Sequence, residues 1–261
     1  MTNKERNDYW HKWNRFQQKW EKYYTARFTK ALKIQAEAYI KTQEMTSIPS
    51  FPIYTALVDL YKKVGPSWAK TVLRDGIKDG RMGFSEEIIR LMQEYFGIDL
   101  LNDAEDITAY TRYVIGKILS KGAQDGLSFD EMAKMIMTST ELGPMRARRI
   151  ARTETVTAAN GAAMITAKRS GAKMTKTWIS IQDRRTRHNQ WANHYTIDGL
   201  TVDYEKPFKL QSQRLGEILM QQPGVRTQDN GLPVPAVEVV NCRCTVAFAA
   251  KRDSRGRIIR A

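Results

Sequence analysis

The sequence predicts an α+β protein, with helices over the first two thirds of the chain and a small, mostly antiparallel sheet in the last third. The prediction rests on a change of period at Gly171. Before this residue, apolar side chains recur every three or four positions, as in helices; after it they alternate, as in strands. At 42% hydrophobic and 27% charged residues, the 261-residue chain has the composition of a globular protein. We therefore expect a helical N-terminal arm and a small helical domain, then a long helix packed on the sheet.

Residues 1–47 are predicted to form an amphipathic helical arm. Aromatic residues keep a helical spacing from Tyr9 through Trp13 to Trp20, and neither glycine nor proline occurs before Pro49. Lysine and arginine lie between the aromatic residues, a combination that can bind nucleic acid. Because the aromatic residues follow the helical period, we favour a stripe that packs against a protein surface.

Residues 48–143 are predicted to form a small helical domain. The prolines at positions 49 and 52 end the arm, because each removes a backbone donor. Gly65-Pro66 and Gly97 are expected to stop helices in the same way. The expected helices span about 53–64, 67–75 and 85–96, then a face from Ile107 to Ile118 closed by Gly122, then a short helix capped by Ser128 and Glu131.

Residues 144–250 are predicted to form a basic α+β domain, and residues 251–261 a basic tail. Gly143-Pro144 starts a helix that runs to Gly171, with proline at the position where its missing N–H costs least. A loop rich in Gln, Gly and Pro spans 221–235. Strands are expected at 177–181, 200–202, 237–240 and 245–248.

The net charge of +14 is concentrated in the C-terminal half of the chain. Residues 146–261 hold 21 Lys+Arg against 9 Asp+Glu, a net of +12, whereas residues 1–145 hold 21 against 19, a net of +2. A basic surface of this kind attracts polyanions, nucleic acid first among them, by a mechanism that does not depend on sequence.

Cysteine usage and hydropathy indicate the compartment. No apolar run approaches the roughly 18 residues that a membrane span needs, and the N-terminal residues show no signal-peptide pattern. The two cysteines form a single Cys-x-Cys pair, which is poor disulfide geometry. We therefore expect a protein made in a cytoplasm, with reduced thiols.

Two short segments hold most of the soft ligand groups. Asn241-Cys242-Arg243-Cys244 contains both cysteines, and His188 and His194 are two of the three histidines. We expect these segments to act together. Other motifs precede them in the chain: Arg-Arg-Ile-Ala-Arg-Thr-Glu at 148–154, Asn160-Gly161, Trp178, Asp-Arg-Arg-Thr-Arg at 183–187, Ile197-Asp198-Gly199 and Pro207-Phe208.

In this order the motifs resemble the head morphogenesis family of tailed bacteriophages, the minor head proteins like protein F of phage Mu. The resemblance covers about residues 128–248, and the loop before His194 carries a small insertion that includes residues 188–191. It implies a protein of the capsid interior that is present in few copies, contacts the portal and capsid or scaffold proteins, binds double-stranded DNA and affects genome packaging or ejection. It does not imply an enzyme. From the residues themselves we expect no cofactor, with zinc as the alternative given below.

The candidate site residues fall into two sets. The candidate DNA-binding residues are Arg146, Arg149, Lys168, Arg169, Arg184, Arg187, Arg243, Lys251 and Arg252. A second set is expected to form a structural polar junction: Arg152, Glu154, Asp183, Arg185, His194, Asn241, Cys242 and Cys244. In this junction we expect arginines such as Arg152, Arg185 or Arg187 to hold the two carboxylates.

Three alternatives stay open. Zinc could be ligated by His194 or His188 together with Cys242 and Cys244, with Asp183 as a possible fourth ligand, although we favour small buried thiols packed under the 183–187 loop. The acids and histidines could instead serve a DNA-processing or toxin-like enzyme. The third alternative is a purely structural capsid–portal adaptor that does not bind DNA.

Overall fold

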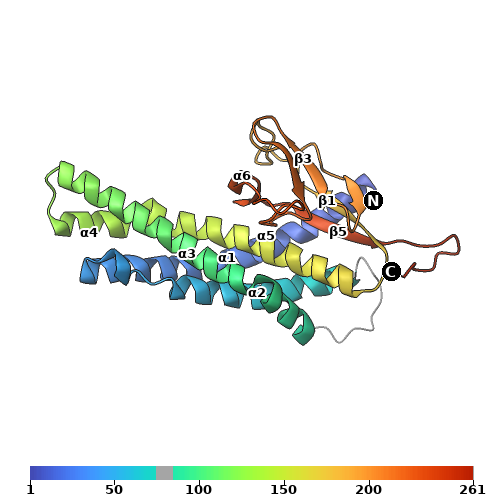
Figure 1. The fold of residues 1–261 in the computed structure, drawn as a ribbon, viewed down its shortest axis with the longest axis horizontal. Helices are drawn as coiled ribbons and strands as arrows, with labels where there is room; N and C mark the ends of the chain where they lie inside the picture. Colours follow the sequence, from blue (N-terminus) through green and yellow to red (C-terminus); the bar gives the residue numbers. More distant parts are fainter. Residues whose placement is uncertain (75–84, 261) are drawn as a thin grey trace.

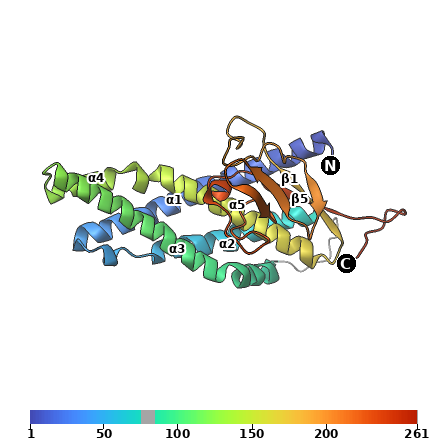
Figure 2. The ribbon, with the colours of Figure 1, turned by 45° about the horizontal axis from the view of Figure 1, so that its top comes forward.

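The computed structural model describes residues 1–74 and 85–260. Long helices run side by side along the longest axis of the molecule, and the sheet lies over α5 toward one end, where both termini are also found (Figures 1 and 2). The main helices are α1 Asn3–Thr42, α2 Phe51–Val72, α3 Ser85–Gln124, α4 Phe129–Thr138 and α5 Pro144–Arg169, with 3-10 turns η1 Met45–Ser47 and η3 Thr140–Leu142 between them.

Helix α1 confirms the predicted helix over the N-terminal arm. It begins with a capping box of Thr2 and Glu5 and ends at Gln43, which adopts a left-handed backbone conformation with φ 60°. Its aromatic stripe packs inside this chain: Trp13 is 1% exposed and its ring lies 4.9 Å from that of Trp68 on α2. The stripe is therefore part of the core of this chain.

Helix α2 runs through Gly65-Pro66, so the predicted stop at this pair is wrong. A proline inside a helix costs about 3 kcal/mol in isolation. Here the site is buried between helices: a Cβ on Gly65 would lie 2.2 Å from the sulfur of Met92 on α3 and 3.1 Å from Cβ of Ala162 on α5. Close packing of three helices offsets the local penalty.

Helix α3 likewise continues through Gly97, where we expected an end. The predicted helices at 85–96 and 107–118 are thus parts of one helix of 40 residues. Glycine lowers helix propensity by only about 1 kcal/mol, which the packing of a long helix overcomes. Residue 75, the predicted end of an earlier helix, lies outside the described part of the chain.

Helix α5 lies at the centre of the fold. It starts at Pro144, as predicted, and packs against α1, α2, α3 and β5. Small side chains make this possible: Ala158, Ala159 and Ala163 are all 0% exposed. A Cβ on Gly161 would lie 2.4 Å from the Phe96 ring. The alanine-rich sequence of α5 therefore reflects contact with neighbours on several sides.

The sheet is antiparallel, in the order β2-β1-β5. Its central strand β1 Met174–Ile179 pairs with β2 Thr201–Asp203 and β5 Thr245–Ala250, so that Thr177 faces both Thr201 and Ala247. A separate hairpin of β3 Phe208–Ser212 and β4 Gly216–Met220 was not predicted. Its tight turn uses Gly216 at φ 77°.

The predicted strand at 237–240 is wrong, because these residues form most of the short helix α6 Ala236–Val239. Its β-branched residues suggested a strand. Pro235 caps the helix, and its carbonyl accepts the N–H of Glu238 at 2.9 Å. Asn241 follows with φ 65°, which turns the chain toward the cysteines.

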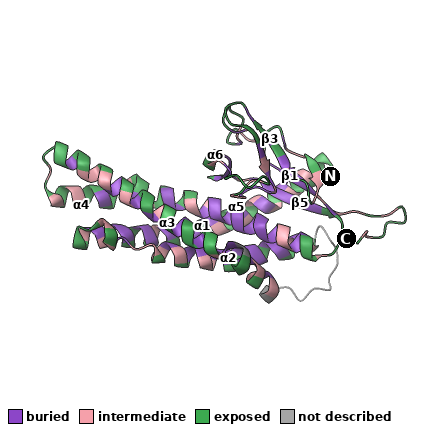
Figure 3. Cartoon of the chain, viewed as in Figure 1, coloured by how far each residue is buried: buried purple, intermediate pink, exposed green. Residues whose placement is uncertain are grey.

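One hydrophobic cluster connects the helices to the sheet, including Trp13, Leu57, Ala158 and Trp178. Buried residues accordingly follow the inner faces of the helices and continue into the sheet (Figure 3). The predicted boundaries near residues 47 and 143 fall next to helix ends, and the division into domains stays a prediction. Among the described helices, none has both the length and the apolar character needed to cross a membrane.

Candidate functional site

A bidentate ion pair ties the loop after β1 to the cysteine segment. The guanidinium of Arg243 donates to Asp183 through Nη1 to Oδ2 at 3.0 Å and through Nη2 to Oδ1 at 2.6 Å. The backbone N–H of Arg185 donates to the same carboxylate at 2.9 Å. The hydrogen bonds from Arg243 hold the pKa of Asp183 well below its usual range. The loop is therefore fixed on the segment that contains both cysteines.

Of the arginines expected to hold Asp183, only Arg185 contacts it, through its backbone N–H and a longer ion pair. Arg185 approaches it only at 3.6 Å through Nε. Arg187 donates to the backbone carbonyl of Val240 and so ties the loop to the end of α6. Arg243, which we placed in the candidate DNA-binding set, makes the bidentate pair, and its side chain is only 10% exposed.

The two soft-ligand segments meet in the interior, in accord with the expectation that they act together. Nδ1 of His194 lies 3.6 Å from Sγ of Cys242 and 3.5 Å from Sγ of Cys244. The three residues are 1%, 1% and 5% exposed, respectively. His188, by contrast, is exposed, and its Nδ1 lies 2.8 Å from the carbonyl of Thr186. The structure thus selects His194 as the partner of the cysteines.

Glu238 holds the other side of the His194 ring. Its Oε2 lies 2.5 Å from Nε2 of His194, and the Glu238 residue is 0% exposed. The edge of the ring contacts Trp178 of β1, with ring centroids 5.4 Å apart. Burial favours the neutral ring, but the Cys242 thiolate and Glu238 together raise the pKa of His194. The Cys244 thiol and the His194 imidazolium hold the pKa of Cys242 well below its usual range.

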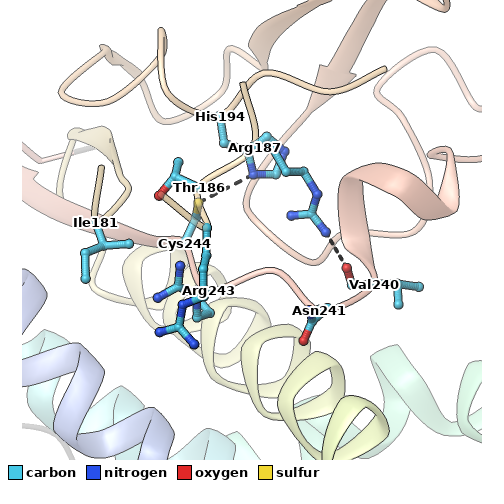
Figure 4. A pocket seen from close by; sticks show the side chains of 9 residues that line it. Ile181, Thr186, Arg187, His194, Val240, Asn241, Arg243 and Cys244 are labelled. Atoms are coloured by element: carbon cyan, nitrogen blue, oxygen red, sulfur yellow. Dashed lines mark hydrogen bonds between the residues drawn. The ribbon is translucent and has the colours of Figure 1, made fainter. Parts of the chain in front are cut away.

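A cavity of about 190 Å³ borders this cluster. Figure 4 shows the side chains around it, with Cys244 and His194 on one side and Arg187 reaching toward Val240. Arg185 and Arg243 also line the cavity. The site is thus a small polar hollow with sulfur, imidazole and guanidinium groups in its wall.

Asn160 on α5 positions the cysteine segment from below. Its side-chain oxygen accepts the Thr245 hydroxyl at 2.9 Å and the N–H of Val246 at 3.2 Å. Its amide nitrogen donates to the carbonyl of Cys244 at 3.3 Å. Because Asn160 is 0% exposed, these bonds replace contacts with water and fix the start of β5 on the central helix.

A buried carboxylate connects α1 to the same region. Glu21 accepts from Nε of Arg152 at 2.8 Å and from Nε of Arg148 at 2.5 Å. Burial favours the neutral acid, but hydrogen bonds from Arg152, Arg148 and Gln17 lower the pKa of Glu21 to about 2. Arg152 also donates to the side chain of Asn241 at 2.6 Å. The first helix is thereby linked to the cysteine segment through α5.

Glu154 is held by a residue that the sequence did not indicate. Nη2 of Arg226 lies 3.0 and 2.9 Å from its two oxygens, and the Tyr61 hydroxyl donates to it at 2.9 Å. Neither Arg152, Arg185 nor Arg187 forms this pair. Arg226 also contacts Asp103 of α3 at 2.7 Å through Nη1. Two buried carboxylates therefore share one guanidinium.

This arrangement keeps Asp103 protonated near neutral pH. Burial and the adjacent Glu154 carboxylate raise the pKa of Asp103 to about 8, against the opposite influence of Arg226. Its Oδ2 is buried and, among the described residues, has no hydrogen-bond partner. One arginine, one carboxylate and one neutral acid leave the network without net charge.

We expect this proton to make stability depend on pH. The folded pKa of about 8 exceeds the ordinary value of 3.8, so the folded state binds the extra proton between these values. The free energy of unfolding should therefore fall as pH rises through this window, by up to about 1.4 kcal/mol per pH unit. Asp103→Asn should remove this pH dependence. Asp99→Asn, which changes an exposed acid of the same helix, should not. Urea unfolding from pH 5 to 8 measures both, and parallel curves for wild type and Asp103→Asn would contradict it.

The second half of the chain matches a known protein family. Residues 114–247, about half of the chain, match the family described as Phage Mu protein F like protein. The chain belongs to this family. The match includes α5, strands β1 to β4, the start of β5, the 183–187 loop and the cysteine segment. Membership places the protein among phage head morphogenesis proteins and confirms the resemblance found in the sequence.

One relative of this Mu F-like chain is an NAD(+)--arginine ADP-ribosyltransferase EFV from Enterococcus faecalis strain ATCC 700802 / V583. It is 33% identical over 129 residues, which is 48% of this chain and 23% of that protein. The Mu F-like chain thus spans less than a quarter of the relative's length. No solved structure matches.

The structure divides the candidate DNA-binding residues by burial. Arg146 is 4% exposed and donates to the carbonyl of Ile107 at 2.6 Å, so the α5–α3 contact removes it from the surface. The guanidinium of Arg243 is paired with Asp183. The exposed members of the set are Arg149, Lys168, Arg169, Arg184 and Arg252, and Arg187 and Lys251 are half-buried.

Several residues of the site were not found from the sequence. Glu21, Glu238 and Arg226 each complete a buried contact with a residue far away in the chain. Asn160 was noted only as part of a motif. A buried charge requires a partner, so the predicted burial of Glu154 signalled that an arginine was needed, but it did not say which one.

Proposed function

We propose that this Mu F-like protein is a minor head protein that lies inside the capsid next to the portal and binds double-stranded DNA non-specifically. The observation that carries the proposal is the net charge of +12 on residues 146–261, in a chain of the head morphogenesis family. Non-specific binding to phosphates needs basic side chains that are exposed and not already neutralised.

The DNA surface is proposed to centre on Lys168, Arg184 and Arg252. All three are exposed, and within residues 1–74 and 85–260 none makes an ion pair. Other exposed candidates have acidic neighbours: Arg149 lies 3.8 Å from Glu141. These arginines contribute less free charge to a bound phosphate.

Salt dependence tests the DNA half of the proposal. Binding to a short random duplex, followed by fluorescence anisotropy, should weaken by about 10³ between 50 and 200 mM salt if several phosphates are neutralised. Replacing Lys168, Arg184 and Arg252 by alanine together should reduce the salt slope by about three. The matched control replaces three exposed lysines of the helical region: Lys62, Lys70 and Lys134. Absence of binding at low salt, or equal loss in both triple variants, would contradict the proposed surface.

The portal or capsid contact is proposed to use the helices away from the sheet. Exposed apolar side chains occur there on α3, on α4 and at the start of α5: Tyr110 is 41% exposed, Tyr113 58%, Met137 43% and Met145 76%. Procapsids assembled with and without portal, probed for this protein, test the contact. Equal incorporation in both would remove the portal from the proposal. Incorporation without any DNA binding would favour the adaptor alternative.

We further propose that the protein acts by binding and not by catalysis. The two acids considered for catalysis, Glu154 and Asp183, are each engaged by an arginine. An ADP-ribosyltransferase is among the relatives, so the direct test is NAD⁺-dependent labelling of arginine-containing proteins. We expect no labelling and no DNA cleavage. Turnover in either assay would reverse the proposal.

A further inference from the structure

The structure assigns a zinc site to His194, Cys242 and Cys244, with Glu238 as the support of the histidine and a solvent molecule as fourth ligand. The three ligand atoms lie within 4.8 Å of one another in the protein interior. This proposal is independent of DNA binding. Thiolate and imidazole together are the ligand types that zinc prefers among the common divalent metals.

The distances fit three corners of a tetrahedron. With Zn–S of about 2.3 Å and Zn–N of about 2.0–2.1 Å, tetrahedral angles place nitrogen and sulfur about 3.6 Å apart. The two observed separations from Nδ1 of His194 are 3.6 Å to Cys242 and 3.5 Å to Cys244. A single imidazole nitrogen has one lone pair for two sulfurs. One metal ion contacts all three atoms, whereas one proton serves only two of them.

Glu238 supplies the second observation that points to a ligand. Its carboxylate lies 2.5 Å from Nε2 of His194, which places the ring proton on that nitrogen and directs the lone pair of Nδ1 at the sulfurs. Carboxylate, histidine and metal in this order form the usual support of a zinc-bound histidine. Glu238 is 0% exposed, and among the described residues its other oxygen, Oε1, has no hydrogen-bond partner. Such a costly buried acid is explained if it stabilises a cationic centre.

The adjacent cavity provides the fourth position. It has a volume of about 190 Å³, and both His194 and Cys244 contribute to its wall (Figure 4). Water in this space has polar partners in Arg185, Arg187 and Arg243. Binding of zinc replaces the thiol protons, so two thiolates form and up to two protons are released to solvent. The two thiolate charges then balance the charge of the ion.

The proposed zinc would act as a structural clamp. Its ligands come from the loop that ends at His194 and from the segment that leads into β5, and the intervening chain contains the hairpin of β3 and β4. Zinc would thus join these two segments, and its binding free energy would add to the stability of this part of the fold.

Metal analysis of the full chain, purified under reducing conditions without chelator, tests the site. We expect about one zinc per chain after gel filtration. In Cys242→Ser and in Cys244→Ser, only a small fraction of the zinc should remain. His188→Asn, which changes an exposed histidine of the same loop, is the matched control and should keep its zinc. A wild-type protein without zinc, or a Cys244→Ser variant with as much zinc as wild type, would overturn the proposal.

Two further measurements apply if a serine variant fails to fold. Cobalt(II) added to chelator-treated wild type should give thiolate charge-transfer and tetrahedral d–d absorption bands, and their absence would count against the site. In competition with a chromophoric chelator, Glu238→Gln should weaken zinc binding by about 10–100-fold, because it loses the charge behind His194. Unchanged affinity in this variant would remove Glu238 from the site.

Discussion

Replacing Trp13 by alanine should lower the free energy of unfolding by about 3–5 kcal/mol. The indole is 1% exposed and packs edge-on against Trp68, with ring centroids 4.9 Å apart. Its Nε1 donates to the carbonyl of Arg243 at 2.8 Å, so the substitution also leaves a carbonyl of the cysteine segment without its partner. Chemical denaturation monitored by far-ultraviolet circular dichroism measures the change.

Two variants separate the contributions of apolar packing and of the hydrogen bond to this loss of stability. Trp13→Phe keeps most of the apolar volume but loses the hydrogen bond, so we expect an intermediate loss of about 1–3 kcal/mol. Tyr23→Ala is the matched control on the same helix: the residue is 44% exposed and contacts its neighbours on one edge, so a loss of about 1 kcal/mol, well below that of Trp13→Ala, is expected. If Trp13→Ala were no more destabilising than Tyr23→Ala, α1 would be a separable arm and not part of the common core.

The sequence of α1 was sufficient to predict a buried helix face but not the residues that cover it. The period of the aromatic residues was enough to predict a helix with one buried face, because the stripe itself carries that information. It did not reveal what covers the face. The covering residues, such as Trp68 and the backbone of Arg243, lie far along the chain. Local pattern therefore predicted the element but not its neighbours.

Local signals failed where tertiary packing outweighs propensity. Gly65-Pro66 and Gly97 are poor helix formers, yet both lie in long helices. Neighbouring helices pack closely at Gly65, whereas a Cβ on Gly97 would meet no atom within 4 Å, so at Gly97 the modest glycine penalty is offset by the rest of α3. Residues 237–240 failed for the opposite reason: valines suggested a strand, while Pro235 and Asn241 bound a single helical turn. By contrast, the capping box of Ser128 and Glu131 depends only on adjacent residues, and it was predicted correctly.

The residues of the candidate site also include some that the sequence could predict and some that it could not. That the histidine and cysteine segments meet could be expected, because soft ligand groups are rare in this chain. The sequence also favoured His194 for the polar junction, because the small insertion before it includes His188, and in the structure His194 is buried whereas His188 is exposed. Glu238 was hidden because its sequence context indicated an alternating strand. The sequence alone favoured metal-free thiols, because it offered only three good ligands and a Cys-x-Cys spacing that is less usual for zinc. The zinc proposal adds Glu238 as the support of His194.

The second large effect is expected at Arg226. Arg226→Met removes the shared guanidinium from Glu154 and Asp103, whose side chains are 6% and 9% exposed. Removing one partner of a buried ion pair costs about 3–5 kcal/mol, because the remaining charge is left without compensation. Since 34% of the Arg226 side chain is exposed, we expect a loss near 3 kcal/mol, at the low end of this range. Thermal and urea unfolding at pH 7 measure it.

Variants of the acids test whether the arginine acts on both carboxylates. Glu154→Gln leaves Arg226 paired with Asp103 and keeps an acceptor for Tyr61, so its loss should be smaller than that of Arg226→Met. Arg214→Met, at an exposed arginine of the β3–β4 turn, is the control for loss of a positive charge. In the double variant Arg226→Met with Glu154→Gln, part of the stability should return, since the uncompensated carboxylate is gone. Simple additivity of the two losses would show that Arg226 stabilises the fold through packing and not through Glu154.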